Sequence, residues 1–228
     1  MKITILTICP EQFGDFRKTP LISRSLQKGL LQLEIVDIRD YAEGCFRKVD
    51  DSPYGGGPGM ILRCQPILDA LKDVSVPDSY TVILSPAGRR YEQQDAHRLA
   101  ELSHLVLVCG HFEGMDARIC AHANEQISIG DYILTGGELA AMVIVDSVMR
   151  LIKGSMKEES IQEESFEQGL LEYPQYTRPA DYQGEKVPDI LLSGDHEAIR
   201  KWRKEQAVRL TETMRPDLIR TQDHKGSF

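Results

Sequence analysis

Two glycine-rich segments hold the residues best suited to chemistry, because main chain without side chains can approach a ligand closely. Residues 128–138 read SIGDYILTGGE, and residues 54–60 read YGGGPGM. Neither matches a common phosphate-binding motif, since GxGxxG would need a glycine at Met60 and the GxxxxGK[ST] pattern is absent. Residues 54–60 could approach a ligand in this way, or they could simply form a flexible surface turn.

The segment at residues 128–138 is suited to binding a nucleoside. An adenine edge presents a donor beside an acceptor, and a loop backbone can match that pair with one carbonyl and one N–H group. Gly130, Gly136 and Gly137, together with LVCGHFEG at residues 107–114, could enclose an adenosine without any phosphate motif. A strand end and a helix start that simply need tight turns are the alternative.

Cysteine and histidine alternate in a second possible site, formed by Cys109, His111, Cys120 and His122. The letters HFE match the HxE of zinc deaminases, but the PCxxC partner of that motif is absent. A buried cysteine at a strand end and a loop histidine explain these residues more simply, so we expect no metal site. No cysteine has an electropositive sequence context that would make it a nucleophile.

Charged residues near the end of an apolar stretch, residues 137–152, could support acid–base chemistry. Arg150 lies four residues after Asp146, so an ion pair within a helix is one interpretation and a guanidinium placed toward the loops is another. Acidic residues then crowd together, namely Glu158, Glu159, Glu163 and Glu164. Mutual repulsion in an enclosed site would favour proton uptake by one of them, as a general base requires. A solvated acidic loop is the alternative.

A basic, amphipathic helix is expected near residues 197–214, with Ser193 or Asp195 as its N-cap. It carries one tryptophan and several cations, namely Arg200, Lys201, Trp202, Arg203, Lys204 and Arg209. Cations neutralise phosphates and an indole can stack on a base, which favours an RNA contact. Because glutamates share this helix, an ordinary solvated helix is the alternative.

Alternating sequence patterns predict the elements that must position these residues. Short, β-branched apolar runs occur at residues 3–8, 33–38, 80–85 and 104–110. Helical patterns lie between or after them, at residues 21–31, 66–72, 93–102 and 116–123. This order predicts an α/β domain with a parallel sheet covered on both faces. Ligands of such sheets bind at the loops after the carboxyl ends of the strands.

Composition narrows the class of protein. The 228 residues, 41% of them hydrophobic, suffice for one large domain or one domain with an appendage. The five cysteines never form CxxC, which favours reduced thiols and a cytoplasmic protein. Neither an export signal nor a membrane span is visible, so we expect no membrane partner. The net charge of −8 means that nucleic acid must meet a local basic patch.

Taken together, the motifs resemble the bacterial tRNA (guanine-N1)-methyltransferase family, TrmD, within the SPOUT methyltransferases. The matching segments occur in the family's order over nearly the whole chain: ITILTICPEQF, DDSPYGGGPGM, LSPAGR, LVCGHFEG, SIGDYILTGGELAAMVIVDSVMR, EESFEQGLLEYPQYTRP and VPDILLSGDHEAIRKWR. The resemblance implies a SPOUT-type parallel sheet with a C-terminal trefoil knot, plus a small, mostly helical C-terminal domain. The implied boundaries are 1–152 for the methyltransferase domain, with the cofactor-binding knot at about 84–137, then 153–165 for a flexible acidic linker and 166–228 for a tRNA-binding domain.

The resemblance also implies that S-adenosyl-L-methionine is held by the main chain of three loops in the knot. The expected contacts are Leu84, Ser85, Pro86, Gly110, Glu113, Ile129, Gly130, Asp131, Tyr132, Ile133, Leu134, Gly136 and Gly137. The implied substrate is the guanosine immediately 3′ of the tRNA anticodon, methylated on N1. The residues expected to contact the RNA are Pro58, Gly59, Arg200 and Arg203.

Guanine N1 carries a proton, so a base must accept it while positive charge stabilises the oxyanion that grows on O6. The resemblance assigns the charge to Arg150 and the base to Glu164. The family usually has aspartate at the position of Glu164, and Glu163 is therefore the second candidate. The family further implies a homodimer with its active site at the subunit interface and assistance by Mg2+, and no carboxylate cluster in the sequence marks a place for that ion.

Two other functions compete with this interpretation. One is a related SPOUT enzyme that acts on another RNA or on a ribose oxygen. The other is a catalytically silent RNA-binding homologue, which the glutamate in EES at residues 163–165 would favour.

Overall fold

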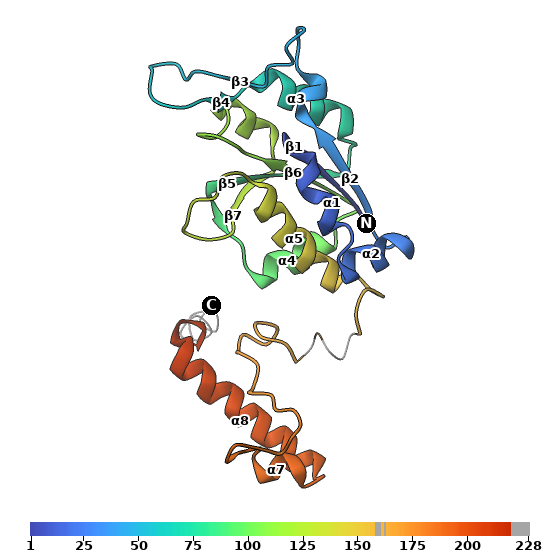
Figure 1. The fold of residues 1–228 in the computed structure, drawn as a ribbon, viewed down its shortest axis with the longest axis vertical. Helices are drawn as coiled ribbons and strands as arrows, with labels where there is room; N and C mark the ends of the chain where they lie inside the picture. Colours follow the sequence, from blue (N-terminus) through green and yellow to red (C-terminus); the bar gives the residue numbers. More distant parts are fainter. Residues whose placement is uncertain (158–160, 162, 220–228) are drawn as a thin grey trace, which may run out of the picture. The chain divides into compact units, whose positions relative to one another are not determined.

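The computed structural model describes residues 1–157, 161 and 163–219, within two compact units, Met1–Met156 and Lys157–Phe228 (Figure 1). Each unit is described by itself. Two of the acidic residues singled out in the sequence, Glu158 and Glu159, lie outside the described residues.

A five-stranded sheet with the order β2-β1-β6-β5-β7 forms the centre of the first unit. Its strands are β1 (Lys2–Thr7), β2 (Gln32–Asp37), β5 (Ser79–Arg90), β6 (His104–Cys109) and β7 (Glu125–Ser128). Every neighbouring pair is parallel, so the predicted α/β class with a parallel sheet is confirmed. Two short antiparallel strands, β3 (Asp50–Asp51) and β4 (Ile61–Leu62), enclose the YGGGPGM segment.

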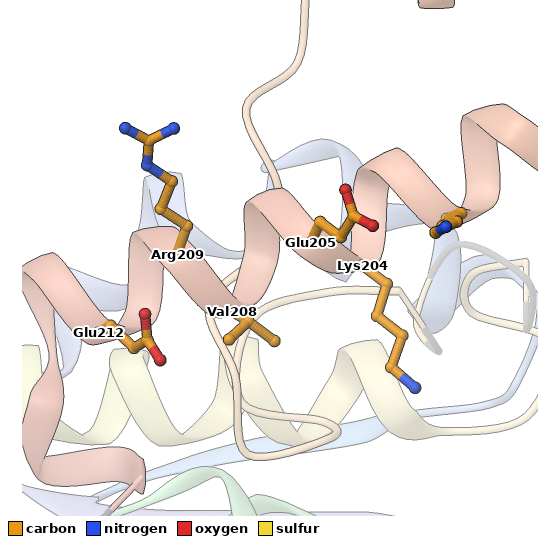
Figure 2. Close-up of a pocket in the computed structure, with 6 residues that line it drawn as sticks. Lys204, Glu205, Val208, Arg209 and Glu212 are labelled. Carbon is orange, nitrogen blue, oxygen red and sulfur yellow. The ribbon is translucent and has the colours of Figure 1, made fainter.

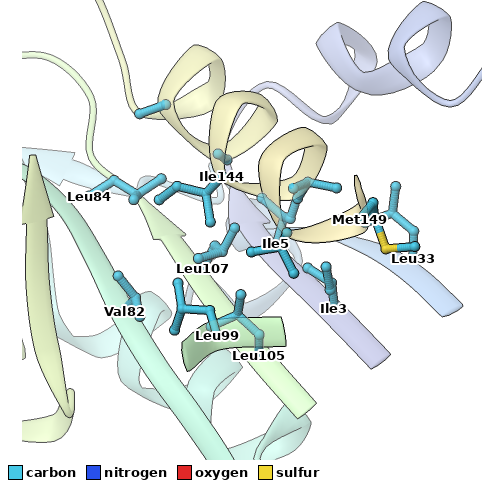
Figure 3. Close-up of a cluster of buried hydrophobic side chains, with 14 of the residues drawn as sticks. Ile3, Ile5, Leu33, Val82, Leu84, Leu99, Leu105, Leu107, Ile144 and Met149 are labelled. Atoms are coloured by element: carbon cyan, nitrogen blue, oxygen red, sulfur yellow. The ribbon is translucent and has the colours of Figure 1, made fainter. Parts of the chain in front are cut away.

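Side chains alternate along the central strands between two hydrophobic layers, which explains the near-continuous apolar runs. In β6, Leu107 belongs to one layer and Val108 to the other. The first layer is covered by α1 (Phe13–Phe16), α2 (Pro20–Gln27), α4 (Gln93–Ala100) and α5 (Glu138–Leu151). Figure 3 shows Ile144 of α5 over the strand residues of this layer. The second layer is covered by α3 (Cys64–Val74) and the 3₁₀ helices η2 (Ile38–Tyr41) and η3 (Ala117–His122).

The sheet differs from the sequence prediction at β5 and β7. The run predicted at residues 80–85 continues to Arg90, because the chain rejoins β7 after a shift in register between Leu84 and Arg89. β7 was not predicted, since Ile127 is the one strongly apolar residue in its sequence EQIS. Tertiary pairing, rather than local pattern, makes both segments extended.

Two predicted helices are shorter or tighter than expected. The helix predicted at residues 21–31 ends at Gln27, and Gly29 follows with φ of +68°. The helix predicted at residues 116–123 is the 3₁₀ helix η3, whose first turn is closed by the Asp116 carboxylate accepting from the Arg118 N–H at 2.9 Å. The short 3₁₀ helix η1 (Pro10–Gln12) follows β1 and was not predicted.

Helix α5 is buried on one side only within this unit. Ile144 and Met149 are fully buried, whereas Leu139 is 55% and Val143 is 46% exposed. The sequence suggested burial either inside the chain or in a subunit interface. Because Leu139 and Val143 are apolar and exposed, burial of their side of α5 in a subunit interface stays a prediction.

The second unit contains a hairpin of β8 (Asp181–Tyr182) and β9 (Glu185–Lys186), the short helix α7 (Asp189–Leu192) and the long helix α8 (His196–Met214). The Asp195 carboxylate accepts hydrogen bonds from the N–H groups of Glu197 and Ala198, both at 3.1 Å, which confirms one of the two predicted N-caps. The Leu171 N–H donates to Thr211 Oγ1 of α8 at 2.9 Å and ties the preceding segment to that helix. Among the described residues, no helix is both long and apolar enough to cross a membrane.

His104 is a buried polar residue at the start of β6. Its Nε2 lies 2.9 Å from Thr4 Oγ1, and its Nδ1 lies 2.7 Å from Ser79 Oγ. Burial lowers the pKa of the imidazole, and the charge of Lys2 lowers it further against the opposing effect of Glu34. The folded state therefore favours the neutral ring.

We predict that the free energy of unfolding of this unit decreases as the pH falls below about 6.5, the ordinary histidine pKa. The unfolded state binds the proton more readily than the folded state. The contribution of His104 to the free energy of unfolding is therefore complete above that pH, and it is lost as the pH falls through the lowered pKa of the folded state. Urea titrations at about pH 7.5 and about pH 5.5, followed by methyl NMR signals of the sheet, measure the change. His104→Gln should reduce the difference between the two conditions, and an equal difference in both proteins would contradict the prediction.

Candidate functional site

A cavity of about 500 Å3 opens beyond the carboxyl ends of β6 and β7, beside the register shift of β5. Its walls are formed by residues 83–87 of β5, by the loops that follow β6 and β7, and by the first turn of α5. Ligands of parallel sheets bind at this edge, and pockets for small ligands have volumes of roughly 300–1,000 Å3. The cavity therefore has the place and the size of a ligand site.

All but one of the residues predicted to contact the cofactor line this cavity. They are Leu84, Ser85, Pro86, Gly110, Glu113, Ile129, Gly130, Tyr132, Ile133, Leu134, Gly136 and Gly137. Asp131 is the exception, because its largely exposed carboxylate pairs with Arg90 Nη2 at 2.8 Å. His111 and Phe112 also line the cavity, although the sequence analysis did not select them as cofactor contacts. Their position in CGHFEGMD, immediately after a predicted strand, could have identified them as candidate ligand contacts.

A close crossing of main chains closes one side of the cavity. The Gly137 N–H donates to the Gly110 carbonyl at 2.8 Å, where the start of α5 meets the end of β6. A Cβ on Gly137 would lie 2.8 Å from Cys109 Cα and 3.0 Å from the Gly110 nitrogen. Since its φ of −80° suits any residue, contact with backbone is what requires glycine there. The tight-turn interpretation therefore accounts for Gly137 without a ligand.

The loop after Leu84 is folded equally tightly against β7. A Cβ on Gly88 would come 2.5 Å from the backbone carbon of Ile127. Ser85 Oγ accepts from the Ala87 N–H at 3.2 Å, which closes the turn within SPAGRR. Glycine at position 88 thus lets this loop cross β7 and line the cavity, a requirement that the sequence analysis missed.

The YGGGPGM segment is attached to the cavity wall through Glu113. The Glu113 N–H donates to the Met60 carbonyl at 3.0 Å, and the Leu62 N–H donates to the Gly114 carbonyl at 3.0 Å. Gly59, with φ of +82°, lies so close to the Glu113 side chain that a Cβ would overlap it. Neither Gly59 nor Pro58 lines the cavity itself. The segment is therefore anchored beside the cavity at Gly59 and Met60, whereas residues 54–58 are exposed, as a surface turn would be.

The two residues predicted to carry out the chemistry belong to different units. Arg150 lies half-buried in the last turn of α5, in the first unit. Glu164 belongs to the second unit, where its N–H donates to the Ile161 carbonyl at 3.1 Å. The alternative base, Glu163, accepts a hydrogen bond from the Tyr173 hydroxyl at 2.9 Å. Burial and this carboxylate raise the pKa of Tyr173.

The basic helix α8 carries the residues expected to contact RNA. Arg200 is exposed, whereas the Arg203 guanidinium lies 4.7 Å from the centre of the Tyr173 ring and 3.6 Å from Glu163 Oε2. Arg203 therefore also packs within its own unit. A shallow surface of the same helix is lined by Lys201, Lys204, Glu205, Val208, Arg209 and Glu212. Figure 2 shows Val208 with the charged side chains of Lys204, Glu205, Arg209 and Glu212 around it. Mixed charge of this kind is also typical of a solvated helix, so the RNA role stays a prediction.

The cysteine and histidine residues of the possible metal motif are not assembled as the sequence spacing suggested. Cys109 is fully buried in β6, where burial raises the pKa of its thiol well above the ordinary value, and His122 is exposed. Among the described residues, the group whose donor atoms come together is instead Cys9, His111 and Glu138. All five cysteines are free thiols.

Comparison with known proteins identifies the family. The model of the family described as tRNA (Guanine-1)-methyltransferase TrmD matches residues 1–221. The chain belongs to this family. It is 51% identical over 223 residues to the tRNA (guanine-N(1)-)-methyltransferase of Geobacillus kaustophilus, with 96% of this chain and 91% of the relative covered. It is 47% identical over 219 residues to the enzyme of the same name from Malacoplasma penetrans, with 96% and 97% covered.

Membership in the TrmD family confirms the resemblance drawn from the sequence motifs. The match includes all three loops of the cavity, the YGGGPGM segment, and both Arg150 and Glu164. It does not by itself assign a role to any of these residues, so their roles remain predictions.

We predict that Gly137→Ala lowers the free energy of unfolding by about 1–3 kcal/mol, because the added methyl group must displace backbone atoms of β6. Gly14→Ala is the matched control, since a Cβ there meets nothing within 4 Å and alanine favours the helix. Urea titration measures both variants. Equal stabilities for the two would show that the crossing at Gly137 tolerates a side chain.

Proposed function

We propose that this protein is an S-adenosyl-L-methionine-dependent methyltransferase that modifies N1 of the guanosine immediately 3′ of a tRNA anticodon. The observation that carries the proposal is the family match over residues 1–221, in which the strand-end cavity is included. The two relatives described above are each named tRNA (guanine-N(1)-)-methyltransferase, and those names favour guanine N1 over a ribose oxygen or a silent homologue. A tRNA substrate also favours the cytoplasm as the site of action.

The cavity fits the methyl donor in size and in lining. Its wall combines apolar side chains, such as Ile133 and Leu134, with the main chain of Gly110 and Gly130. Backbone carbonyl and N–H groups can pair with an adenine edge, and apolar side chains can cover its ring. When bound, the donor supplies a methyl group on a positively charged sulfur. The chain's own task is to hold that methyl group toward the substrate and to keep water away.

Methyl transfer to guanine N1 requires removal of a proton. In the proposal the Glu164 carboxylate accepts the N1 proton, and the electron pair left on N1 would then take the methyl group that a bound donor supplies. Arg150 stabilises negative charge on guanine O6 during this step. Glu163, which accepts a hydrogen bond from Tyr173, is the second candidate for the base.

A trefoil knot over about residues 84–137 is part of the proposal. Three observations support it: β5 rejoins β7 after its register shift, the Gly88 backbone packs against Ile127, and Gly137 crosses the end of β6. Knotted chains are rare among proteins, so the sequence pattern of strands and helices alone would not predict a knot.

A homodimer with its active site at the subunit interface is also part of the proposal. The exposed apolar side chains Leu139 and Val143 on α5 support an interface on that helix. The division of Arg150 and Glu164 between two compact units is compatible with an active site completed by a second chain. Assistance by Mg2+ and contacts of Pro58, Gly59, Arg200 and Arg203 with the RNA complete the proposal.

The decisive experiment is methyl transfer to two tRNA transcripts that differ only in the nucleotide 3′ of the anticodon, guanosine or adenosine. We expect labelled methyl from S-adenosyl-L-methionine to enter only the guanosine transcript, since adenine N1 has no proton for Glu164 to remove. Nuclease digestion and mass spectrometry should show N1-methylguanosine. Methyl transfer to both transcripts, or a ribose-methylated product, would contradict the proposal.

Glu164→Gln should lower turnover by about a hundredfold or more, because an amide cannot accept the N1 proton. Calorimetry with S-adenosyl-L-methionine should give an unchanged affinity, because Glu164 belongs to the unit that does not form the cavity. Glu163→Gln is the matched variant and should retain most of the turnover. A larger loss of turnover in Glu163→Gln than in Glu164→Gln would identify Glu163 as the base. Full turnover in both variants would show that neither glutamate is the base.

A further inference from the structure

Three potential metal ligands from distant parts of the chain meet beside the cavity. Cys9 follows β1, His111 follows β6 and Glu138 is the first residue of α5. One donor atom from each residue lies within 4.8 Å of the other two. Neither the proposed methyl transfer nor the family match uses this group, which is called the Cys9 cluster below.

One ring nitrogen in the Cys9 cluster has no protein partner. His111 Nδ1 is buried and, in the described part of the chain, accepts or donates no hydrogen bond. Its nearest charged neighbour is Glu138 Oε2 at 3.7 Å, which is beyond hydrogen-bond distance. Buried polar atoms are rarely left in this state, and an unseen ion is one of the ordinary explanations. The nitrogen therefore points to a missing ligand.

Space for that ligand is kept open by the glycine next to the helix start. A Cβ on Gly136 would overlap both His111 Nδ1 and Glu138 Oε2. Glycine at this position consequently keeps a side chain from displacing either donor atom. Gly136 and His111 both line the cavity, so the Cys9 cluster lies beside it.

The Glu138 carboxylate is buried and already oriented. It is 2% exposed, and its Oε1 accepts a hydrogen bond from the Thr7 hydroxyl at 2.7 Å. Thr7 Oγ1 in turn accepts from the Cys9 N–H at 2.9 Å. Hydrogen bonds of this kind characteristically orient the ligands of a metal site, and here they leave Oε2 directed at His111.

We propose that the Cys9 cluster binds one divalent transition-metal ion of the zinc class through Cys9 Sγ, His111 Nδ1 and Glu138 Oε2. A thiol with an imidazole favours zinc-like ions, whereas Mg2+ prefers oxygen ligands alone. In tetrahedral zinc sites neighbouring donor atoms lie about 3.3–3.8 Å apart, so the observed group needs to contract only slightly. Binding displaces the Cys9 proton to solvent, and the fourth position is open to water or a molecule in the cavity.

Such an ion would join β1, the loop after β6 and α5 at the rim of the cavity. The inference does not depend on the proposed methyl transfer, because it concerns ion binding alone. It also differs from the motif considered in the sequence, which combined His111 with Cys109, Cys120 and His122. Of that motif, only His111 belongs to the Cys9 cluster.

Cobalt provides the test, because Co2+ replaces zinc and reports a thiolate ligand by an intense near-ultraviolet absorption band. The full chain, freed of metal by a chelator, is titrated with Co2+ and then with Zn2+. We expect one equivalent of Co2+ to produce the band and Zn2+ to remove it. Cys9→Ser should abolish the band and weaken binding by about tenfold or more. Cys45→Ser is the matched control, since Cys45 is exposed and outside the cluster, and it should leave the titration unchanged.

A second measurement needs no variant, in case Cys9→Ser fails to fold. Iodoacetamide labelling with mass spectrometry should show that Zn2+ protects Cys9 in the natural chain and leaves Cys45 reactive. Absence of the cobalt band, a band that persists in folded Cys9→Ser, or equal labelling of Cys9 with and without Zn2+ would each overturn the proposal. Loss of methyl transfer with normal cobalt binding would count against the proposed function alone.

Discussion

The close contact between the start of α5 and the end of β6 is the constraint on which the rest of the site depends. At Gly137 the main chain comes too near Cys109 and Gly110 to admit any side chain, and a hydrogen bond joins the two segments at 2.8 Å. Because α5 begins at this point, its buried face is directed onto the sheet through residues such as Ile144. The residues between β7 and α5 must then bend away from the sheet, and the cavity is the space that they enclose.

Close packing explains why this small region contains so many glycines. Gly88 allows β5 to pack closely against β7, Gly137 allows α5 to begin against β6, and Gly136 keeps a side chain out of the Cys9 cluster. In each case the missing Cβ would meet protein atoms, so the bare main chain serves the fold before it serves any ligand. The two interpretations of the glycines are therefore compatible: the tight turns create the cavity, and the same main chain is then available to a nucleoside.

The proposed chemistry divides its work between two units. The first unit holds the cavity and Arg150, while the second carries Glu164 and the basic helix α8. The proposed chemistry requires residues of both units, because guanine N1 must lose a proton to form the bond to the methyl group. The Cys9 cluster lies at the junction of β1, β6 and α5, so an ion there would stabilise the unit that contains the proposed methyl-donor cavity.

The sequence alone determined the features that depend on local pattern. Alternating apolar runs predicted the parallel sheet, Asp195 was among the predicted caps of α8, and the ordered motifs identified the TrmD family. Only the tertiary structure showed that Asp131 turns away from the cavity and that β5 rejoins β7. It also brought Cys9 beside Glu138, from opposite ends of the first unit. Periodicity and propensity act over a few residues, whereas these contacts are decided by which distant segments pack together, and that information is not carried by any local stretch of the chain.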